Sequence, residues 1–513
     1  MLYTFFSISW RIWYTFSPIN ESGDTRGAIL HSTAELRDIL ARIGWWTDPE
    51  GWIRRDPDLR RAREAPFDYT AGVLDALVPG GLYVLRGPRR VGKSVEIKKT
   101  VQRLIEDGED PRRIIHIAAD ELEAADLRRV VDAAEALTPA SGRRFWFFDE
   151  ITAIPDGWPS AIKWLRDNDL RFGLDTVVLT GSSARDLTEA VKAFAGRRGG
   201  AIDSDRVLLP MSFRSFLRAQ ADAEGEGEVV PPPDGAPLPL AGLTPEVLDE
   251  AARRLAPWLP HLVRGWETYL AVGGFPQAVA AHAVTDPPNP ETGAGPAARA
   301  LKESLLDVIR GEAFGQSAWS RAHTDAFVNR LAAGIGSPTN SSEIASDTGT
   351  SANTVRRRID TLRESFVVWP CYREHRLAPA LRAQEKTYFT DPIFTALSAR
   401  SRRPVDLSLL SEQQLGMTLV RAFLRWDAGG YPNFDAVLHH RTRSRKEIDF
   451  AGPGFGGLAI ESKYVDGDRW KRAAPTLKAS PWRGLVATRA VLDMSDPDLS
   501  AVPTALLAWL LGG

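Results

Sequence analysis

The residues at 87–94 have the types and the spacing of a phosphate-binding loop. They read GxxxxGKS and are Gly87, Pro88, Arg89, Arg90, Val91, Gly92, Lys93 and Ser94. In such a loop, backbone N–H groups and the first turn of the next helix face an anion, and the glycines let the backbone wrap closely around it. The lysine reaches the β- and γ-phosphates, and the hydroxyl group after it binds Mg²⁺. The pattern therefore predicts that Lys93 and Ser94 bind Mg·ATP.

Two carboxylates follow an apolar run further along the chain. Residues 145–148 are aromatic, as expected for a strand buried on both faces of a parallel sheet, and Asp149 and Glu150 come next. At such a strand end, the first carboxylate holds Mg²⁺ and the second orients or polarises the attacking water. A solvated strand end is the alternative, and the phosphate-binding loop earlier in the chain favours the catalytic interpretation.

A third expected strand, 176–180, runs into Gly181, Ser182 and Ser183. Small hydroxyl groups at this strand end could sense the γ-phosphate or hold the attacking water, so Ser182 is a candidate nucleotide contact. A plain turn is almost as good an explanation for these residues.

The C-terminal part of the chain carries residues for a different chemistry. Asp449 lies in an expected strand, a turn rich in Gly and Pro follows, and Glu461 and Lys463 lie in a second strand, 458–463. Alternation along that strand puts Glu461 and Lys463 on one face, and a hairpin can bring Asp449 beside them. Two carboxylates would bind Mg²⁺, and the ammonium would position or deprotonate water for phosphodiester cleavage. The alternative is a half-exposed hairpin with charges on its solvent face.

The elements that position these residues follow from the pattern of the chain. Apolar runs that alternate with amphipathic segments from 81 to 209 predict an α/β domain, with a parallel sheet covered by helices. An amphipathic helix is expected from Thr33 to Leu40, behind a cap at Ser32 or Thr33, and it should pack beside this domain. Stretches rich in Pro and Gly at 221–243 and 287–296 indicate linkers or insertions.

A helix-turn-helix is expected at 342–362. Gly349 supplies the turn and Ser351 caps the second helix. The residues that face inward are Ile344, Ala345, Val355, Ile359 and Leu362. A strand at 366–369 would complete a winged helix.

Three consecutive arginines lie on the exposed part of the second helix. They are Arg356, Arg357 and Arg358, placed where contacts to DNA phosphates would be made. Winged helices also serve as protein-contact modules, which is the alternative. Three arginines in a row exceed what solubility needs, so nucleic acid is the favoured partner.

Composition sets limits on the class of protein. The chain has 513 residues, enough for three or four domains, with 43% hydrophobic residues, 25% charged residues and a net charge of −2. This balance excludes a strongly basic nucleic-acid binder but leaves room for a local basic surface. The single cysteine, Cys371, cannot form an internal disulfide, so we expect a cytoplasmic protein. No apolar stretch is long enough for a membrane span, and the aromatic segment Met1 to Ile19 makes a poor signal peptide, so we expect it to be an irregular extension.

Several further segments occur in an order that is specific although each is short. They are Phe148-Asp149-Glu150, Leu179 to Ser183, Ala195-Gly196-Arg197, Leu209-Pro210-Met211-Ser212-Phe213, Tyr269-Leu270, Gly273-Gly274-Phe275-Pro276, Lys386-Thr387-Tyr388 and Asp391. With the loop at 87–94, they make the chain resemble a widespread bacterial and archaeal family of predicted AAA+-type ATPases. That family carries a C-terminal domain of unknown function, number 4143. The resemblance extends from about residue 68 to about residue 463.

The resemblance implies further roles. In similar proteins an arginine of the Gly-Arg element lies near the nucleotide, so Arg197 is a candidate sensor or arginine finger, within the chain or across a subunit boundary. Arg198 carries the same charge, and solvation of both arginines is the alternative. Similar proteins also end in a restriction-endonuclease-like fold, with a further acid on an early helix. Here Thr418 stands where that glutamate is expected and Glu412 is a distant substitute, which counts against nuclease activity.

The sequence thus predicts an α/β protein with several modules. The expected segments are an N-terminal extension and helical lead-in (1–67), a P-loop AAA+-type ATPase domain (68–220), a linker (221–247), a helical lid (248–335), a winged helix (336–384) and a PD-(D/E)xK nuclease-like domain (385–513). The expected function is Mg²⁺-dependent ATP hydrolysis coupled to DNA, with a homo-oligomer or a protein partner as a further possibility. The alternative is a nucleotide-dependent signalling switch that acts through protein contacts and has a nuclease fold that does not cleave.

Overall fold

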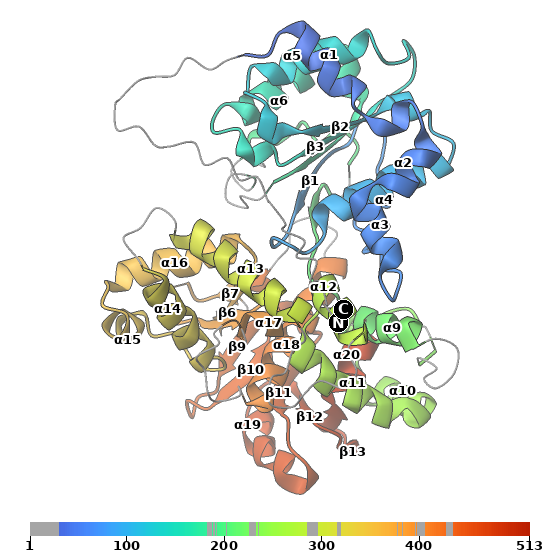
Figure 1. Ribbon diagram of the computed structural model, residues 1–513. Helices are drawn as coiled ribbons and strands as arrows, with labels where there is room; N and C mark the ends of the chain where they lie inside the picture. The colour runs from blue at the N-terminus through green and yellow to red at the C-terminus, as the bar shows by residue number, and fades with distance from the viewer. Residues whose placement is uncertain are drawn as a thin grey trace, which may run out of the picture.

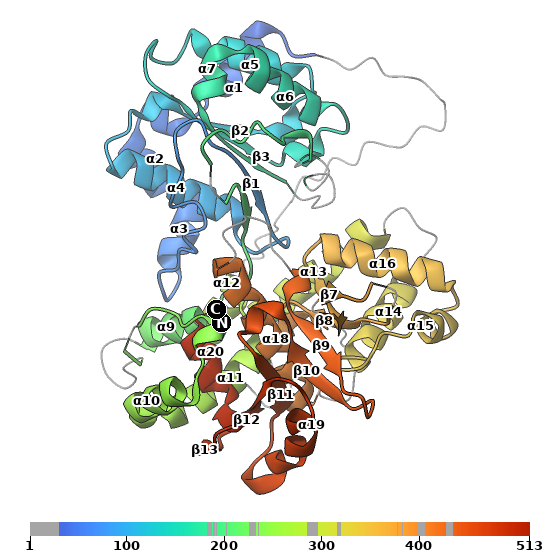
Figure 2. The same cartoon turned by 180° about the vertical axis from the view of Figure 1, so that it is seen from behind.

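Two β-sheets, each with its own helices, organise the computed structural model (Figures 1 and 2). Ser182, Ser183 and the segment Met1 to Ile19 lie outside the described residues. The structure describes residues 30–512 except for 182–186, 188–189, 191, 202, 225–231, 234, 285–295, 315–319, 377, 382, 396, 398–405 and 427–433.

The first sheet has five parallel strands. They are β1 (Leu82–Arg86), β2 (Ile114–Ala118), β3 (Phe145–Asp149), β4 (Thr176–Thr180) and β5 (Asp205–Val207). Their order across the sheet is β2-β3-β4-β1-β5, so β4 lies between the strand before the phosphate-binding loop and the strand that ends in Asp149. The side chains of β1, β3 and β4 are buried on both faces, as their continuous apolar runs indicated. The predicted parallel α/β sheet is confirmed.

Helices cover both faces of this sheet (Figure 1). They are α1 (Thr33–Ala41), α2 (Pro49–Arg55), α3 (Pro57–Glu64), α4 (Lys93–Glu106), α5 (Asp126–Glu135), α6 (Trp158–Asn168) and α7 (Leu170–Leu174). The predicted helix α1 begins behind Ser32, whose hydroxyl accepts a hydrogen bond from the Glu35 N–H, while the Glu35 carboxylate accepts one from the Ser32 N–H. It packs against α5, beside the sheet, as expected.

The second part of the chain begins with a series of helices. They are α9 (Phe213–Glu224), α10 (Pro245–Leu255), α11 (Leu259–Val272), α12 (Pro276–Val284), α13 (Pro296–Phe314), α14 (Arg321–Ala333), α15 (Ser341–Asp347) and α16 (Ala352–Glu364). The turn between α15 and α16 contains Gly349 with φ of +63°, and the Ser351 hydroxyl accepts a hydrogen bond from the Thr354 N–H at the start of α16. The expected helix, turn and helix are therefore present.

A second sheet of nine strands follows. Its strands are β6 (Val368–His375), β7 (Ala378–Pro379), β8 (Lys386–Phe389), β9 (Leu438–Arg441), β10 (Glu447–Ala451), β11 (Leu458–Lys463), β12 (Arg483–Thr488), β13 (Asp493–Asp496) and β14 (Leu499–Pro503). The order is β13-β14-β12-β11-β10-β9-β6-β7, and β8 pairs with β6. Four helices accompany them: α17 (Pro392–Thr395), α18 (Leu407–Trp426), α19 (Ala474–Lys478) and α20 (Thr504–Leu511).

The segments expected as lid, winged helix and nuclease-like domain pack together as one body. Strand β6, which follows α16, pairs in parallel with β9 and so belongs to the same sheet as β10 and β11. Helix α11 packs against α18 and α20, and the Trp266 indole N–H donates a hydrogen bond of 3.1 Å to Ser411 Oγ. The boundaries proposed at 335 and 384 therefore fall inside shared packing.

A close-packed joint connects the two bodies. The Met211 N–H, after β5, donates a 2.6 Å hydrogen bond to Gly274 O, and Tyr269 Oη donates to Met211 O at 3.0 Å. The Gly274 N–H in turn donates to Asp391 Oδ2 at 2.7 Å. Gly273 has φ of +82°, and a Cβ on Gly274 would lie 2.2 Å from Met211 O. The Gly-Gly-Phe-Pro turn therefore has a structural role at this joint.

Among the described residues, no helix has the length and apolar character that crossing a membrane requires.

We predict that Gly274→Ala destabilises the protein. The added methyl group meets the carbonyl oxygen of Met211, a residue that is held by one hydrogen bond at its N–H and one at its oxygen, so we expect the free energy of unfolding to fall by about 1–3 kcal/mol. Denaturant unfolding of the full chain measures this change. Gly311→Ala is the matched control, because its Cβ would meet open space in the last turn of α13, so we expect it to leave the free energy of unfolding unchanged or to raise it slightly. Equal effects of the two substitutions would contradict the role given to the joint.

Candidate functional site

The phosphate-binding loop lies between β1 and α4, with the backbone geometry that its glycines allow. Gly87, Arg90 and Gly92 have φ of +146°, +66° and +108°. A Cβ on Gly87 would lie 2.1 Å from Leu208 O, so only glycine fits there. Gly92 begins α4 without a side-chain cap, which leaves the N–H groups of the first helical turn for an anion.

Lys93 is buried at the start of α4 and spans the loop. Its Nζ donates hydrogen bonds to Gly87 O at 3.0 Å and to Pro88 O at 3.2 Å. The ammonium is therefore held at the concave backbone of the loop, where the β- and γ-phosphates would lie. A phosphate oxygen is a stronger partner for an ammonium than a carbonyl, so these two bonds can be exchanged.

Asp149 meets Ser94 and His116 at the carboxyl edge of the sheet. Burial raises the pKa of Asp149, but the nearby His116 ring and hydrogen bonds from the Ser94 hydroxyl and the Glu150 N–H outweigh burial and hold that pKa below its ordinary value. His116 Nε2, on β2, lies 3.7 Å from Asp149 Oδ2. A hydroxyl group and an ionised carboxylate in contact are ligands suited to Mg²⁺, so Ser94 and Asp149 fit the metal expected beside ATP.

Glu150 follows Asp149 in a left-handed conformation, with φ of +53°. Its N–H donates a 3.1 Å hydrogen bond to Asp149 Oδ1, and the residue is half-buried. An unusual backbone conformation in a non-glycine residue turns its side chain away from the strand direction. Glu150 therefore lies beside the candidate metal ligands without being one of them.

A pocket of about 900 Å³, including its open mouth, adjoins the loop on the side of α3, α4 and α12. It is lined by Asp58, Arg61, Ala62, Ala65, Phe67, Tyr69, Ala71, Arg90, Val91, Gly92, Val95, Glu96, Lys99, Leu208, Pro276, Gln277 and Ala280. Lys99 Nζ fixes the wall of the pocket by donating to Asp68 Oδ1 at 2.8 Å and to Tyr69 O at 2.7 Å. A largely apolar pocket next to a phosphate cradle is the place for the base and ribose of a nucleotide.

The three residues predicted for the nuclease-like site lie together on β10 and β11. The Asp449 N–H donates to Glu461 Oε2 at 3.2 Å, and Lys463 Nζ lies 2.7 Å from Glu461 Oε1. The Ser462 N–H donates to Asp449 Oδ2 at 2.9 Å. The antiparallel pairing of β10 with β11 brings the two carboxylates side by side, as expected.

Glu412 is part of this cluster, so the expectation that it is a distant substitute was wrong. Its Oε1 lies 3.2 Å from Lys386 Nζ, which also lies 3.2 Å from Asp449 Oδ1 and 2.7 Å from Glu447 Oε1. Thr418, by contrast, donates its hydroxyl to Gln414 O within α18. The helix presents Glu412, which lies about 1.7 turns before Thr418, to the strands.

Burial and mutual repulsion shift the protonation of these carboxyl groups. Burial, and after it the charge of Asp449, raises the pKa of Glu412 and that of Glu461 to about 7. Burial opposes the charge of Lys386, but Tyr388 and the surrounding carboxylates outweigh it and hold the pKa of Lys386 above its ordinary value. Near neutral pH the cluster therefore contains a charged ammonium and carboxyl groups that share protons.

Comparison with known protein families identifies the nucleotide-binding part. Residues 80–217 match the family model described as an AAA domain. This segment is an AAA-type P-loop ATPase-like domain. Residues 263–402 match a domain of unknown function numbered 8612, whereas the resemblance had suggested number 4143. None of the curated proteins with which the chain was compared matches it.

The chain is similar to several solved structures, at low sequence identity and low TM-score, and three of them follow. The Walker-type ATPase PABY2304 of Pyrococcus abyssi is 16% identical over 68% of this chain and 95% of its own, with a TM-score of 0.37. Cdc6p of Pyrobaculum aerophilum is 12% identical over 69% and 90%, with a TM-score of 0.24. The RuvB Holliday junction branch migration motor of Thermotoga maritima is 12% identical over 61% and 88%, with a TM-score of 0.22. Scores this low carry no argument about function.

Arg197 lies at the opposite edge of the AAA domain from the loop. Its Nε lies 2.7 Å from Asp167 Oδ1, and its neighbour Arg198 accepts a hydrogen bond at its carbonyl oxygen from the Leu82 N–H at the start of β1. The phosphate-binding loop follows the other end of β1. The structure therefore does not bring Arg197 to the nucleotide site of its own chain. A contact with a nucleotide bound to a neighbouring subunit stays a prediction.

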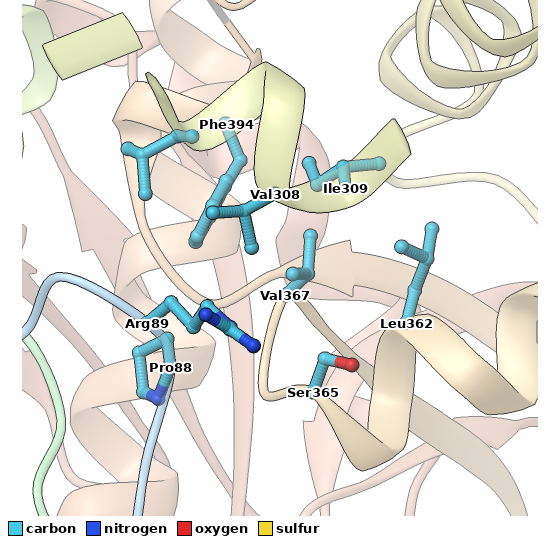
Figure 3. Close-up of a pocket in the computed structure, with 9 residues that line it drawn as sticks. Pro88, Arg89, Val308, Ile309, Leu362, Ser365, Val367 and Phe394 are labelled. Carbon is cyan, nitrogen blue, oxygen red and sulfur yellow. The ribbon is translucent and has the colours of Figure 1, made fainter. Parts of the chain in front are cut away.

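A cavity separates the loop of the AAA domain from the second body (Figure 3). Pro88 and Arg89 line one side, and the Arg89 guanidinium points into the cavity. The other side is lined by Leu305, Val308, Ile309, Leu362, Ser365, Val367 and Phe394. The phosphate-binding loop is therefore placed against α13, the end of α16 and the start of β6.

The arginines of α16 differ in exposure. Arg356 and Arg357 are exposed, whereas Arg358 is half-buried, and burial lowers its pKa. The inward face of the helix pair is buried, as expected, at Ile344, Ala345, Val355, Ile359 and Leu362. Two of the three candidate phosphate contacts thus face solvent.

Several site residues were not foreseen. His116 is the single polar residue among the five of β2, and this isolated polar position was a signal that could have been used. Lys386 and Tyr388 appeared only as part of the family resemblance, with no role. Their contacts with Glu412 join elements that are distant in sequence, which no local pattern shows.

We predict that Glu412→Gln flattens the pH dependence of stability between pH 4.5 and 7. The folded-state pKa of Glu412, about 7, lies above the ordinary value of 4.5, so the folded protein binds the proton more tightly than the unfolded chain. This contribution to stability is complete below the unfolded-state pKa and is lost as the pH rises through 7, by at most about 3 kcal/mol. Denaturant unfolding at a series of pH values measures it.

Glu50→Gln, at an exposed position of α2, is the control and should leave the slope unchanged. A Glu412→Gln variant with the same slope as the original protein would contradict the shift assigned to Glu412.

Proposed function

We propose that the chain is a Mg·ATP-dependent ATPase whose turnover is coupled to nucleic acid through its second body. The observation that carries this proposal is the meeting of Lys93, Ser94 and Asp149 at one edge of a parallel sheet, beside a pocket with room for a nucleoside. Because Cys371 is single and buried, we place the protein in the cytoplasm.

Each residue at this edge has a distinct task in the proposed reaction. The loop 87–92 and the N-terminus of α4 would bind the phosphates through backbone N–H groups, and Lys93 would neutralise the β- and γ-phosphates. Ser94 and Asp149 would hold Mg²⁺, which supplies charge neutralisation when bound. Glu150 would accept the proton of the attacking water, and His116 keeps Asp149 ionised and oriented. Ser182 remains a candidate contact to the γ-phosphate.

Two basic surfaces of the second body support nucleic acid as the partner. The first consists of Arg356 and Arg357 on α16, which is the capped second helix of the helix-turn-helix and precedes the β6–β7 hairpin, as in a winged helix. The second is the exposed turn between β9 and β10, which contains Arg443, Arg445 and Lys446. Among the described residues, no carboxylate lies within ion-pair distance of these three side chains. Phosphate backbones bind to such surfaces by releasing counterions.

The alternative is a nucleotide-dependent switch that acts through protein contacts. It is favoured by the cavity in Figure 3, because Arg89 of the loop faces the C-terminal end of α16 and could transmit the nucleotide state to that helix. In this case a partner protein, or a second copy that receives Arg197 at its nucleotide, would read the state.

We predict that Lys93→Ala weakens ATP binding at least 100-fold and leaves the fold intact. The ammonium supplies charge-assisted hydrogen bonds to the phosphates, and the alanine variant removes them while keeping the loop glycines. Titration with a fluorescent ATP analogue measures the affinity, and thermal unfolding checks the fold. Lys163→Ala, on the exposed face of α6, is the matched control and should bind ATP normally. ATP affinity that survives the loss of Lys93 would contradict the assignment.

We predict that DNA increases Mg²⁺-dependent ATP turnover and that Glu150→Gln abolishes turnover with and without DNA. Loss of the general base should lower kcat by about 10²-fold or more while ATP still binds. The measurement is phosphate release with no DNA, single-stranded DNA or double-stranded DNA. Replacing Arg356 and Arg357 together by alanine should remove the stimulation and leave the basal rate. Basal turnover that ignores DNA would instead support the protein-contact switch.

A further inference from the structure

The nuclease-like cluster already contains a cation. Lys386, at the start of β8, is fully buried, and its Nζ lies 2.7 Å from Glu447 Oε1 and 3.2 Å from both Glu412 Oε1 and Asp449 Oδ1. An ammonium has three N–H groups, so three carboxylates from α18 and β10 satisfy all of them. Asp449 is one of the two carboxylates expected to bind Mg²⁺, so the Lys386 ammonium already occupies an expected metal ligand.

Several other acceptors of the cluster are also occupied. Asp449 Oδ2 accepts from the Ser462 N–H, and Glu461 accepts from the Asp449 N–H and contacts the Lys463 ammonium. Tyr388 Oη donates a 2.6 Å hydrogen bond to Glu412 Oε1. Mg²⁺ requires near-octahedral oxygen ligands at about 2.0–2.1 Å, several of them water, and it would have to share these oxygens with an adjacent ammonium.

The surroundings do not fit a metal ion. Among the described residues, no group of three or more His, Cys, Asp and Glu side chains is arranged to hold one. Lys386 is itself fully buried, and its backbone pairs with Cys371 on β6 and with Pro338. Two cations in direct contact repel each other, so a metal could bind only if this buried lysine left.

We propose that Lys386 is a built-in cation that takes the place of the divalent metal, so that this site joins α18 to β10 and does not cleave phosphodiester bonds. The proposal deepens the nucleic-acid part of the proposed function and is independent of the phosphate-binding loop. The basic turn between β9 and β10 directly precedes Glu447, so nucleic acid could still bind beside a cluster that cannot cut it.

The experiment compares Mn²⁺ binding to the full-length protein and to two variants in the absence of nucleotide. Lys386→Met keeps the length of the side chain and removes its charge, while Lys463→Met removes the other lysine of the cluster and leaves Lys386 in place. Electron paramagnetic resonance of free Mn²⁺ gives the number bound. We expect Lys386→Met to gain one Mn²⁺ per chain, at least tenfold tighter than the original protein binds it. We expect no gain for Lys463→Met, and a loss of the gain when Asp449→Asn is added.

Cleavage of the backbone by bound Fe²⁺ and peroxide, mapped by mass spectrometry, locates the metal in the unaltered protein. Absence of cuts near Asp449 and Glu461 supports the proposal and needs no variant to fold. Cuts there, or a folded Lys386→Met variant that gains no Mn²⁺, would overturn it. Cuts in the backbone beside Ser94 and Asp149 when ATP is added test metal binding at the phosphate-binding loop. Failure of the ATPase proposal can therefore be told apart from failure of the proposal for Lys386.

Discussion

The segment Leu208–Met211, which leaves the first sheet, is packed without spare room between the two bodies, and the arrangement of the molecule depends on it. Leu208 O lies where a Cβ on Gly87 would be, and Met211 O lies where a Cβ on Gly274 would be, at 2.1 and 2.2 Å. One short stretch of backbone therefore touches the phosphate-binding loop at its start and the Gly-Gly turn at its end. Arg421 of α18 adds a hydrogen bond of 2.6 Å to Pro210 O in the same stretch.

This packing would give a bound nucleotide a physical route to the second body. Lys93 bonds to the carbonyl groups of Gly87 and Pro88, the residues that face Leu208 and the cavity against α13. A phosphate that drew the ammonium away from these carbonyls would change the loop where it meets both neighbours. Close-packed contacts do not deform continuously, so under the proposed function a small change in the loop would shift the elements packed against it.

The sequence predicted site residues well where they form one contiguous motif with its own strand and helix. It failed where the rotation of a helix against a sheet determines which residue faces the site. The phosphate-binding loop is contiguous, and its strand, glycines and helix each carry a local signal, so its residues could be placed before the fold was known. Glu412 and Thr418 lie on the same helix, and only the packing of α18 shows which one faces β10: Gly416 fits closely against Trp369 and Phe450, which fixes the rotation of the helix. Charge and spacing likewise do not reveal which edge of a sheet a residue reaches, so the role of Arg197 across a subunit boundary stays a prediction.

Lys93 and Lys386, the two lysines that are buried among the described residues, show that a buried ammonium can occur in two opposite kinds of site. Lys93 bonds to neutral carbonyl groups beside an open pocket, so an arriving phosphate offers it a stronger partner and the bonds exchange. Lys386 bonds to three carboxylates that are themselves buried, and its removal would leave their charges without compensation in a medium of low polarity. The first arrangement awaits an anion from solution. Around Lys386, the negative charges come from carboxylates of the protein itself. Lysine and carboxylate side chains, which could catalyse cleavage with a metal, here hold helix α18 against strand β10.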